Sequence, residues 1–240
     1  MVDIVHRQGA PRPGHGGDPG ALELRVAGED RRISFTPREL VVAGFTGRDQ
    51  TAVREHVEEL ARAGVPRPAE VPAFYRLDAA LLTTTPAIRV RGARTSGEAE
   101  PVLFCTGDGW YVGLGSDHTD RDLERDDIAR SKAACPKPVG TEVLPYELAR
   151  ARWDDLRLCS WTGESGARYQ DGSAAELLPI PELLARLGAP DGAAGLVVFC
   201  GTVPLAAGSF VFGDAFRAEL ALAGGPRIGL RYRIDLEDER

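Results

Sequence analysis

Two apolar segments flank a tight-turn signal near the middle of the chain, and this pattern constrains the fold more than any other feature of the sequence. The segments are residues 101–105 and 110–114, and Thr106-Gly107-Asp108-Gly109 lies between them. Glycine and aspartate paired between two apolar runs are a strong signal for a β-hairpin with a short loop. We therefore predict an antiparallel pair of strands here.

The position of the loop in this hairpin decides which carboxylates lie opposite each other. The residue numbers of every opposed pair in a hairpin add up to the same total, and the loop sets that total. A two-residue loop at Gly107-Asp108 sets Glu98 opposite Asp117. A loop one residue later sets Glu100 opposite Asp117 instead. In both registers Asp117 shares a face with Glu98 and Glu100, since residues two apart on a strand point the same way. A three-residue loop would break this arrangement.

Three carboxylates on one face of a strand pair repel one another unless a cation neutralises them. An all-oxygen set suits Mg²⁺, Mn²⁺ or Ca²⁺, and the lack of nearby paired histidines or cysteines argues against zinc. The spacing therefore predicts a divalent-metal site at Glu98, Glu100 and Asp117. The alternative is that Glu98 and Glu100 are ordinary solvent-facing residues at a strand end.

The chain contains 29 Lys and Arg residues, and only two of them are lysines, Lys132 and Lys137. The ammonium group of lysine is a compact point charge whose pKa shifts readily, so arginine does not replace it at every site. A site that needs such a charge near an oxyanion would keep its lysine. We expect at least one of the two to be functional, with chance clustering as the alternative.

Glycine and proline account for 28 and 17 residues, which predicts many turns and few long helices. The apolar periodicity predicts a hairpin at 22–26 and 33–35, a buried strand at 40–44, helices at 49–63, 145–157 and 181–187, and a strand at 228–236. The first helix is the clearest, because Val53, Val57 and Leu60 form one apolar stripe and Gly64 follows as a C-cap.

Charge and composition argue against several classes of protein. The net charge is −7 and the basic residues form no block, so no nucleic-acid partner is expected. No segment has the length and apolarity of a signal peptide or a membrane span, so no membrane partner is expected either. The four cysteines include no Cys-x-x-Cys pair, which favours reduced thiols in a cytoplasmic protein. Residues 1–20 are rich in glycine and proline and are expected to form a flexible tail.

Six short motifs follow one another between about residues 40 and 204. They are Gly44-Phe45 with His56 and Glu59, the segment 72–76, the Glu-x-Glu segment 96–100, the Gly-Ser-Asp segment 115–123, the lysine segment 131–136 and the Gly-Thr turn 201–204. In order and approximate spacing they resemble the lid helix, the phenylalanine–lysine strand and the metal-binding signatures of the fumarylacetoacetate hydrolase superfamily. The chain resembles a divergent, poorly characterised branch of that superfamily.

The resemblance implies an α+β, predominantly β fold, a mixed β-roll with short peripheral helices. It implies a single domain over residues 21–240, in which 21–80 form an N-terminal part with the lid helix and 81–240 form the metal-binding β-roll. It also implies a homodimer. The chain departs from the family pattern at Ser116, where an asparagine is usual, and at Arg76, where a lysine is usual.

The same resemblance raises the expectation that Glu98, Glu100 and Asp117 bind Mg²⁺ or Mn²⁺, with Ca²⁺ as an alternative. The implied activity is metal-dependent hydrolysis of a carbon–carbon bond in a small-molecule β-diketone or 2,4-dioxo acid, as in acylpyruvates. Such a reaction needs a base for the attacking water and a cationic pocket for the substrate's oxyanions.

Several residues are candidates for these roles. His56, oriented by Glu59, would take the proton from water. Lys132 and Arg121 would bind a substrate carboxylate or a developing oxyanion, assisted by the hydroxyl of Thr202. Arg76 would bind the substrate from the strand that follows the lid helix.

Other functions stay open on sequence grounds. Decarboxylation, hydration or isomerisation of an oxo-acid on the same scaffold does not need the water-activating pair, and His56 could instead be a surface histidine beside the apolar face of its helix. A non-catalytic ligand-binding or interaction protein on a retired enzyme fold is a further alternative.

Overall fold

The structure is a computed structural model that describes residues 20–62, 66–163, 166–190 and 192–237. Residues 1–19 of the predicted tail and the predicted helix cap at Gly64 lie outside the described residues.

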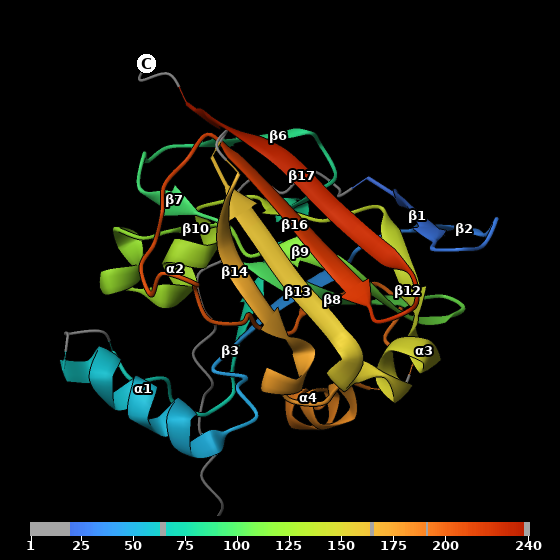
Figure 1. Cartoon of the computed structure of the whole chain (residues 1–240), viewed down its shortest axis with the longest axis horizontal. Helices are drawn as coiled ribbons and strands as arrows, with labels where there is room; N and C mark the ends of the chain where they lie inside the picture. Colours follow the sequence, from blue (N-terminus) through green and yellow to red (C-terminus); the bar gives the residue numbers. More distant parts are fainter. Residues whose placement is uncertain (1–19, 63–65, 164–165, 191, 238–240) are drawn as a thin grey trace, which may run out of the picture.

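Two β-sheets form the body of the molecule, with the five-stranded sheet in front of the eight-stranded one in Figure 1. The eight-stranded sheet has the order β2-β1-β12-β9-β8-β15-β3-β4. Its strands are β1 (Leu22–Val26), β2 (Arg32–Phe35), β3 (Glu39–Gly44), β4 (Ala73–Leu77), β8 (Ala99–Thr106), β9 (Gly109–Ser116), β12 (Glu142–Pro145) and β15 (Leu196–Phe199). This sheet therefore joins strands from the first eighty residues to strands from the rest of the chain.

The five-stranded sheet has the order β14-β13-β16-β17-β6. Its strands are β6 (Ala87–Val90), β13 (Leu156–Thr162), β14 (Ala167–Ser173), β16 (Ala215–Leu222) and β17 (Arg227–Leu236). Two small pairs complete the β-structure: β7 (Thr95–Ser96) with β10 (Thr119–Asp120), and β5 (Leu82–Thr83) with β11 (Lys137–Pro138).

The helices of the described chain are short and lie around the sheets (Figure 1). They are α1 (Gln50–Arg62), α2 (Ile128–Ala133), α3 (Tyr146–Ala151) and α4 (Ile180–Leu187), with 3₁₀ turns η1 (Ala79–Leu81), η2 (Leu123–Arg125), η3 (Trp153–Asp155) and η4 (Ala174–Glu176). The predicted α+β, predominantly β architecture with short peripheral helices is confirmed. No described helix is both long enough and apolar enough to span a bilayer.

The β8–β9 hairpin runs between two apolar cores, which is why every residue of β8 is buried. Leu103 and Leu114 belong to the core that faces the five-stranded sheet. Val102 and Phe104 belong to the core on the other side, which includes residues of β1, β2 and β3. A hairpin held on both faces gives its open end a fixed position, and the candidate site lies at that end.

The predicted helix at 145–157 was wrong in its second half. The helix ends at Ala151, a 3₁₀ turn follows, and β13 begins at Leu156. Leu156 and Leu158 lie on either side of the exposed Arg157 along β13 and fill the core under the five-stranded sheet, so tertiary packing overrides the helical pattern. The predicted helix at 181–187 is confirmed as α4, and Gly188 ends it in the left-handed conformation with φ 67°.

Candidate functional site

The register of the β8–β9 hairpin sets the geometry of the site. Ala99 pairs with Ser116 and Thr106 pairs with Gly109, so the loop consists of Gly107 and Asp108. This is the first of the two predicted registers. Beyond the last pair, the backbone N–H of Asp117 donates to the carbonyl oxygen of Glu98 at 2.9 Å, so these two residues lie opposite each other as predicted.

Asp117 is fully buried, and both lysines of the chain reach it. Lys132 Nζ donates to Asp117 Oδ2, and Lys137 Nζ lies 3.3 Å from Asp117 Oδ1. Burial alone would raise the pKa of Asp117, but the two ammonium charges outweigh it and hold the pKa well below its usual range. Lys137 also donates to the carbonyl oxygens of His118 at 2.6 Å, of Cys135 at 3.2 Å and of Lys132. Lys137 therefore cross-links the backbone around Asp117 from inside the protein.

Glu98 and Glu100 each have a different partner. Arg121 Nη2 lies 3.1 Å from Glu98 Oε2, and Arg121 Nη1 donates to Glu124 Oε2 at 2.8 Å. The backbone N–H of Gly201 donates to Glu100 Oε2 at 2.7 Å. Burial, and then the negative charge of the neighbouring aspartate, raise the pKa of Glu100 well above its usual range. Glu100 is thus a buried carboxyl whose ionised form lacks a full counter-charge.

Glu98, Glu100 and Asp117 are the candidate ligands for a metal ion. In the described part of the chain, no three Asp, Glu, His or Cys side chains converge closely enough to hold one. The residue types still fit a hard divalent cation, because Asp117 lies opposite Glu98 and Glu100 follows two residues along the same strand end. An ion held by Glu98, Glu100 and Asp117 would take the place of Lys132 at Asp117.

A buried polar network lies directly behind Asp117. The hydroxyl of Tyr232 lies 2.9 Å from Ser116 Oγ and 3.0 Å from His118 Nδ1, and His118 Nε2 lies 2.9 Å from Thr95 Oγ1. Burial, and then the nearby positive charges, lower the pKa of His118 to about 3, so its ring is neutral at pH 7. The two sequence positions on either side of Asp117 are therefore joined through one tyrosine of the opposite sheet.

Tyr232→Phe is expected to lower the free energy of unfolding by about 1–2 kcal/mol, because it leaves buried polar groups on Ser116 and His118 without a partner. Urea unfolding measures the change. Tyr146→Phe is the matched control, since no side-chain hydrogen bond of the Tyr146 hydroxyl is found in the described structure, and it is expected to change stability little. Equal effects of the two substitutions would contradict the network's contribution.

The predicted Gly-Thr turn lies against the carboxylates. Gly201 has φ 93°, and a Cβ added there would lie 1.8 Å from Thr46 Oγ1, so no other residue fits. Thr202 Oγ1 donates to the carbonyl oxygen of Ala99 at 2.7 Å and accepts from Gln170 Nε2 at 2.5 Å. These bonds hold the Gly201 N–H on Glu100, whereas a contact of Thr202 with substrate stays a prediction.

His56 and Glu59 lie on the outer side of α1, away from the apolar stripe of Val53 and Val57. Their side chains are 61% and 68% exposed, and His56 Nδ1 lies 3.7 Å from Glu59 Oε2. Among the described residues, no hydrogen bond or ion pair joins either side chain to the three carboxylates. The structure thus forms the predicted pair but does not bring it to the carboxylates.

Arg76 also lies apart from the carboxylates. It is exposed and pairs with Glu39 across β3 and β4. The preceding residue, Tyr75, points to the other face of β4, and its ring centre lies 5.7 Å from Lys132 Nζ. Sequence reasoning missed Tyr75, although its place one residue before Arg76 on a strand already put it on the opposite face.

Comparisons with known proteins agree with this architecture. Residues 43–239 match the family model described as "Protein of unknown function (DUF2848)". A search of curated proteins gave no match.

Solved structures with similar folds include two enzymes of oxo-acid type and a fumarylacetoacetate hydrolase family protein. The fumarylpyruvate hydrolase of Pseudomonas aeruginosa, in complex with Mn²⁺ and pyruvate, aligns at TM-score 0.66 and 18% identity, over 95% of this chain and 100% of that one. The 2-hydroxyhepta-2,4-diene-1,7-dioate isomerase of Mycobacterium marinum aligns at TM-score 0.60 and 14% identity, over 85% and 76%. A fumarylacetoacetate hydrolase family protein of yeast aligns at TM-score 0.60 and 15% identity, over 85% and 95%.

These matches confirm the fold that the sequence motifs predict, and the family model covers most of the chain. The protein belongs to the DUF2848 family and has the fold of the fumarylacetoacetate hydrolase superfamily.

Proposed function

We propose that the protein is a divalent-metal-dependent hydrolase that cleaves a carbon–carbon bond in a β-diketone or a 2,4-dioxo acid of the acylpyruvate type. The observation that carries this proposal is the pairing of Glu98 with Arg121 and of Asp117 with Lys132 at the open end of the β8–β9 hairpin, with the buried carboxyl of Glu100 near both. A protein of the same fold is a fumarylpyruvate hydrolase in complex with Mn²⁺ and pyruvate, which supports both the metal and the oxo-acid class of substrate.

Glu98, Glu100 and Asp117 would hold Mg²⁺ or Mn²⁺ in this proposal. When bound, the ion would supply Lewis-acid polarisation of the substrate's oxygens. Arg121 and the N–H of Gly201 would keep Glu98 and Glu100 oriented, because both already contact these carboxylates.

Lys132 would bind the anionic end of the substrate. Its side chain is only 9% exposed, so a substrate oxygen that reaches it is largely shielded from water. A charge-assisted hydrogen bond is strong in such a place. The ring of Tyr75 beside the ammonium would hold it near the carboxylates after it leaves Asp117.

The assay that tests the proposal follows pyruvate release from a set of acylpyruvates, with Mg²⁺ or Mn²⁺ present and again with EDTA. We expect turnover to depend on the metal. We also expect Lys132→Met to reduce turnover at least about tenfold. Glu98→Ala is expected to lose both metal binding and turnover. Metal binding and turnover that survive Glu98→Ala would show the ligand assignment to be wrong.

His56→Ala is expected to lower kcat by about a hundredfold, because a positioned general base contributes about 10²–10⁴ to such a reaction. This mechanism would require α1 to bring His56 to the carboxylates during turnover, and Glu59, 3.7 Å from His56 Nδ1, would orient the ring. Steady-state kinetics on the best acylpyruvate measure the effect. Arg54→Ala, another exposed change on α1, is the control and should leave kcat unchanged.

Isomerisation or decarboxylation of an oxo-acid is the second candidate function. The exposed position of His56 and Glu59 favours it, since these reactions need no water-activating base. An isomerase of 2-hydroxyhepta-2,4-diene-1,7-dioate has the same fold. An enzyme that keeps its full rate on an oxo-acid after His56→Ala would support this second function over hydrolysis. Tight calorimetric binding of dioxo acids without any turnover would instead identify a non-catalytic binding protein.

A further inference from the structure

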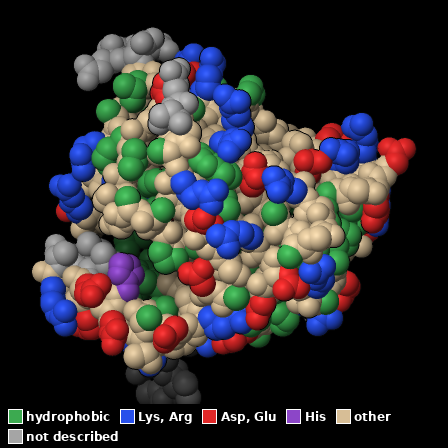
Figure 2. Space-filling model, in the orientation of Figure 1, with side chains coloured by type: hydrophobic (Ala, Val, Ile, Leu, Met, Phe, Trp, Pro, Cys, Tyr) green, Lys and Arg blue, Asp and Glu red, His purple; other side chains and the backbone are tan. Residues whose placement is uncertain are grey.

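The outer face of the five-stranded sheet is rich in arginine. Along its strands, inward residues such as Leu158, Phe216 and Tyr232 are buried, and the residues between them point outward. The outward charged side chains on these strands are seven arginines and three carboxylates: Arg89, Arg157, Arg168, Arg217, Arg227, Arg231, Arg233, Asp171, Glu219 and Asp235. Figure 2 views the molecule from this side and shows blue side chains spread over it. A positive face on a chain of net charge −7 indicates a place where anions gather.

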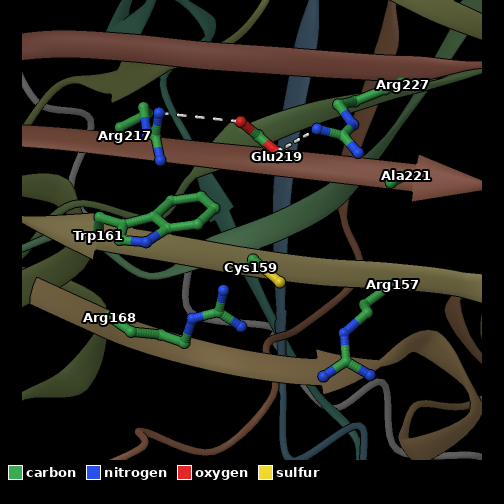
Figure 3. Close-up of a pocket in the computed structure, with 8 residues that line it drawn as sticks. All are labelled: Arg157, Cys159, Trp161, Arg168, Arg217, Glu219, Ala221 and Arg227. Carbon is green, nitrogen blue, oxygen red and sulfur yellow. Dashed lines mark hydrogen bonds and ion pairs between the residues drawn. The ribbon is translucent and has the colours of Figure 1, made fainter. Parts of the chain in front are cut away.

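A hollow of about 430 Å³ lies in the middle of this face (Figure 3). Four of the arginines surround it, one from each of the strands β13, β14, β16 and β17. The lining residues are Arg157, Cys159, Trp161, Arg168, Arg217, Glu219, Ala221 and Arg227. Its volume falls in the range of small-molecule sites, about 300–1,000 Å³.

The four arginines form two pairs, and each pair shares one carboxylate. Arg157 and Arg168 both donate to Asp171. On the other side of the hollow, Glu219 lies 3.3 Å from Arg227 Nη1 and 3.9 Å from Arg217 Nη1, as the dashed lines in Figure 3 show. Each pair therefore keeps one positive charge in excess.

The four guanidinium groups are held in place by neighbouring side chains but remain accessible to a ligand. Arg217 Cζ lies 4.0 Å from the ring centre of Trp161, and Arg168 Cζ lies 5.5 Å from it, so this ring positions one arginine of each pair. All four arginine side chains are at least half exposed. Planar guanidinium groups in this state suit the bidentate binding of phosphate or carboxylate oxygens.

We propose that this hollow is a binding site for a small polyanion with at least two phosphate or carboxylate groups. One anionic group would bind between Arg157 and Arg168, and the other between Arg217 and Arg227. A ligand needs two anionic groups because each arginine pair carries one excess positive charge and the pairs lie on opposite sides of the hollow. The site is separate from the candidate metal site, because it lies on the outer face of the sheet whose inner face carries Tyr232.

Isothermal titration calorimetry with inorganic pyrophosphate tests the proposal, at low ionic strength and with EDTA present. Wild-type protein is expected to show one saturable site. The double variant Arg157→Glu/Arg217→Glu, one change in each pair, is expected to bind at least about tenfold more weakly. Arg25→Glu/Arg31→Glu makes the same change in net charge on β1 and in the turn between β1 and β2, where both arginines also pair with carboxylates, and it should keep the affinity. Circular dichroism of each variant checks its fold, and Arg157→Gln/Arg217→Gln is the milder pair if the glutamates disturb it.

Further titrations define the ligand. Tricarballylate should bind at the same site as pyrophosphate and compete with it, whereas inorganic phosphate should bind at least about fivefold more weakly because it offers one anionic group. No saturable binding of pyrophosphate up to about 10 mM would overturn the proposal. Equal weakening by the control pair would also overturn it, since the attraction would then come from overall charge. Inorganic phosphate that binds as tightly as pyrophosphate would overturn the two-group requirement.

Discussion

Asp117→Ala is expected to lower the free energy of unfolding by about 3–5 kcal/mol at pH 7, the cost of breaking a buried ion pair from one side. The substitution leaves Lys132 and Lys137 with their ammonium groups buried and without the carboxylate that both contact. For a chain of this length, about 2–4 °C of melting temperature is lost per kcal/mol. Urea unfolding followed by circular dichroism measures the free energy, and a thermal scan checks the shift.

Two further variants distinguish the cost of leaving buried lysine charges unpaired from the cost of losing side-chain volume. Asp122→Ala removes an exposed carboxylate that pairs with Arg94, and it should change stability little. Adding Lys132→Met to Asp117→Ala is expected to recover at least about 1 kcal/mol, because one of the two stranded charges is gone. A loss below about 1 kcal/mol in the single variant, or no recovery in the double variant, would show that Asp117 does not neutralise the lysines.

The geometry around Glu98 and Asp117 could be predicted because strand periodicity is simple. Side chains alternate with a period of two along a strand. The turn signal at Gly107-Asp108 therefore predicts that Glu98 and Asp117, each nine positions from the loop, lie opposite each other. The partners of these carboxylates could not be predicted in the same way. Arg121 reaches Glu98 through a turn after β10, and no periodic pattern describes such a turn.

Lys137 illustrates the same limit. It lies between Pro136 and Pro138 and cross-links the backbone from inside the protein. Its burial was not evident from sequence, because its acceptors are backbone carbonyl oxygens of His118, Lys132 and Cys135. Backbone acceptors exist at every position, so residue type alone does not reveal where three of them converge. The partners of His118 are not evident from the sequence for a related reason, since Tyr232 lies more than a hundred residues away.

Glu100→Gln is expected to separate the stability of the fold from the function of the site. Mn²⁺ at about a hundred times its dissociation constant should stabilise the wild-type protein by about 2.7 kcal/mol, because it binds the folded state alone. Glu100→Gln should remove this stabilisation and reduce turnover at least about a thousandfold, since one of three proposed ligands is lost and the Lewis acid with it. Thermal scans with and without Mn²⁺ and the acylpyruvate assay measure the two effects.

Without metal, the same variant should be at least as stable as the wild type. Burial and the charge of Asp117 raise the pKa of Glu100, so a carboxylate at this position opposes folding, whereas the neutral glutamine can still accept the N–H of Gly201. A residue that destabilises the metal-free fold and is needed only with the metal is the expected signature of a ligand. Glu147→Gln, which changes an exposed carboxyl group on α3, is the control and should keep the response to Mn²⁺. An unchanged response in Glu100→Gln would remove Glu100 from the proposed ligand set.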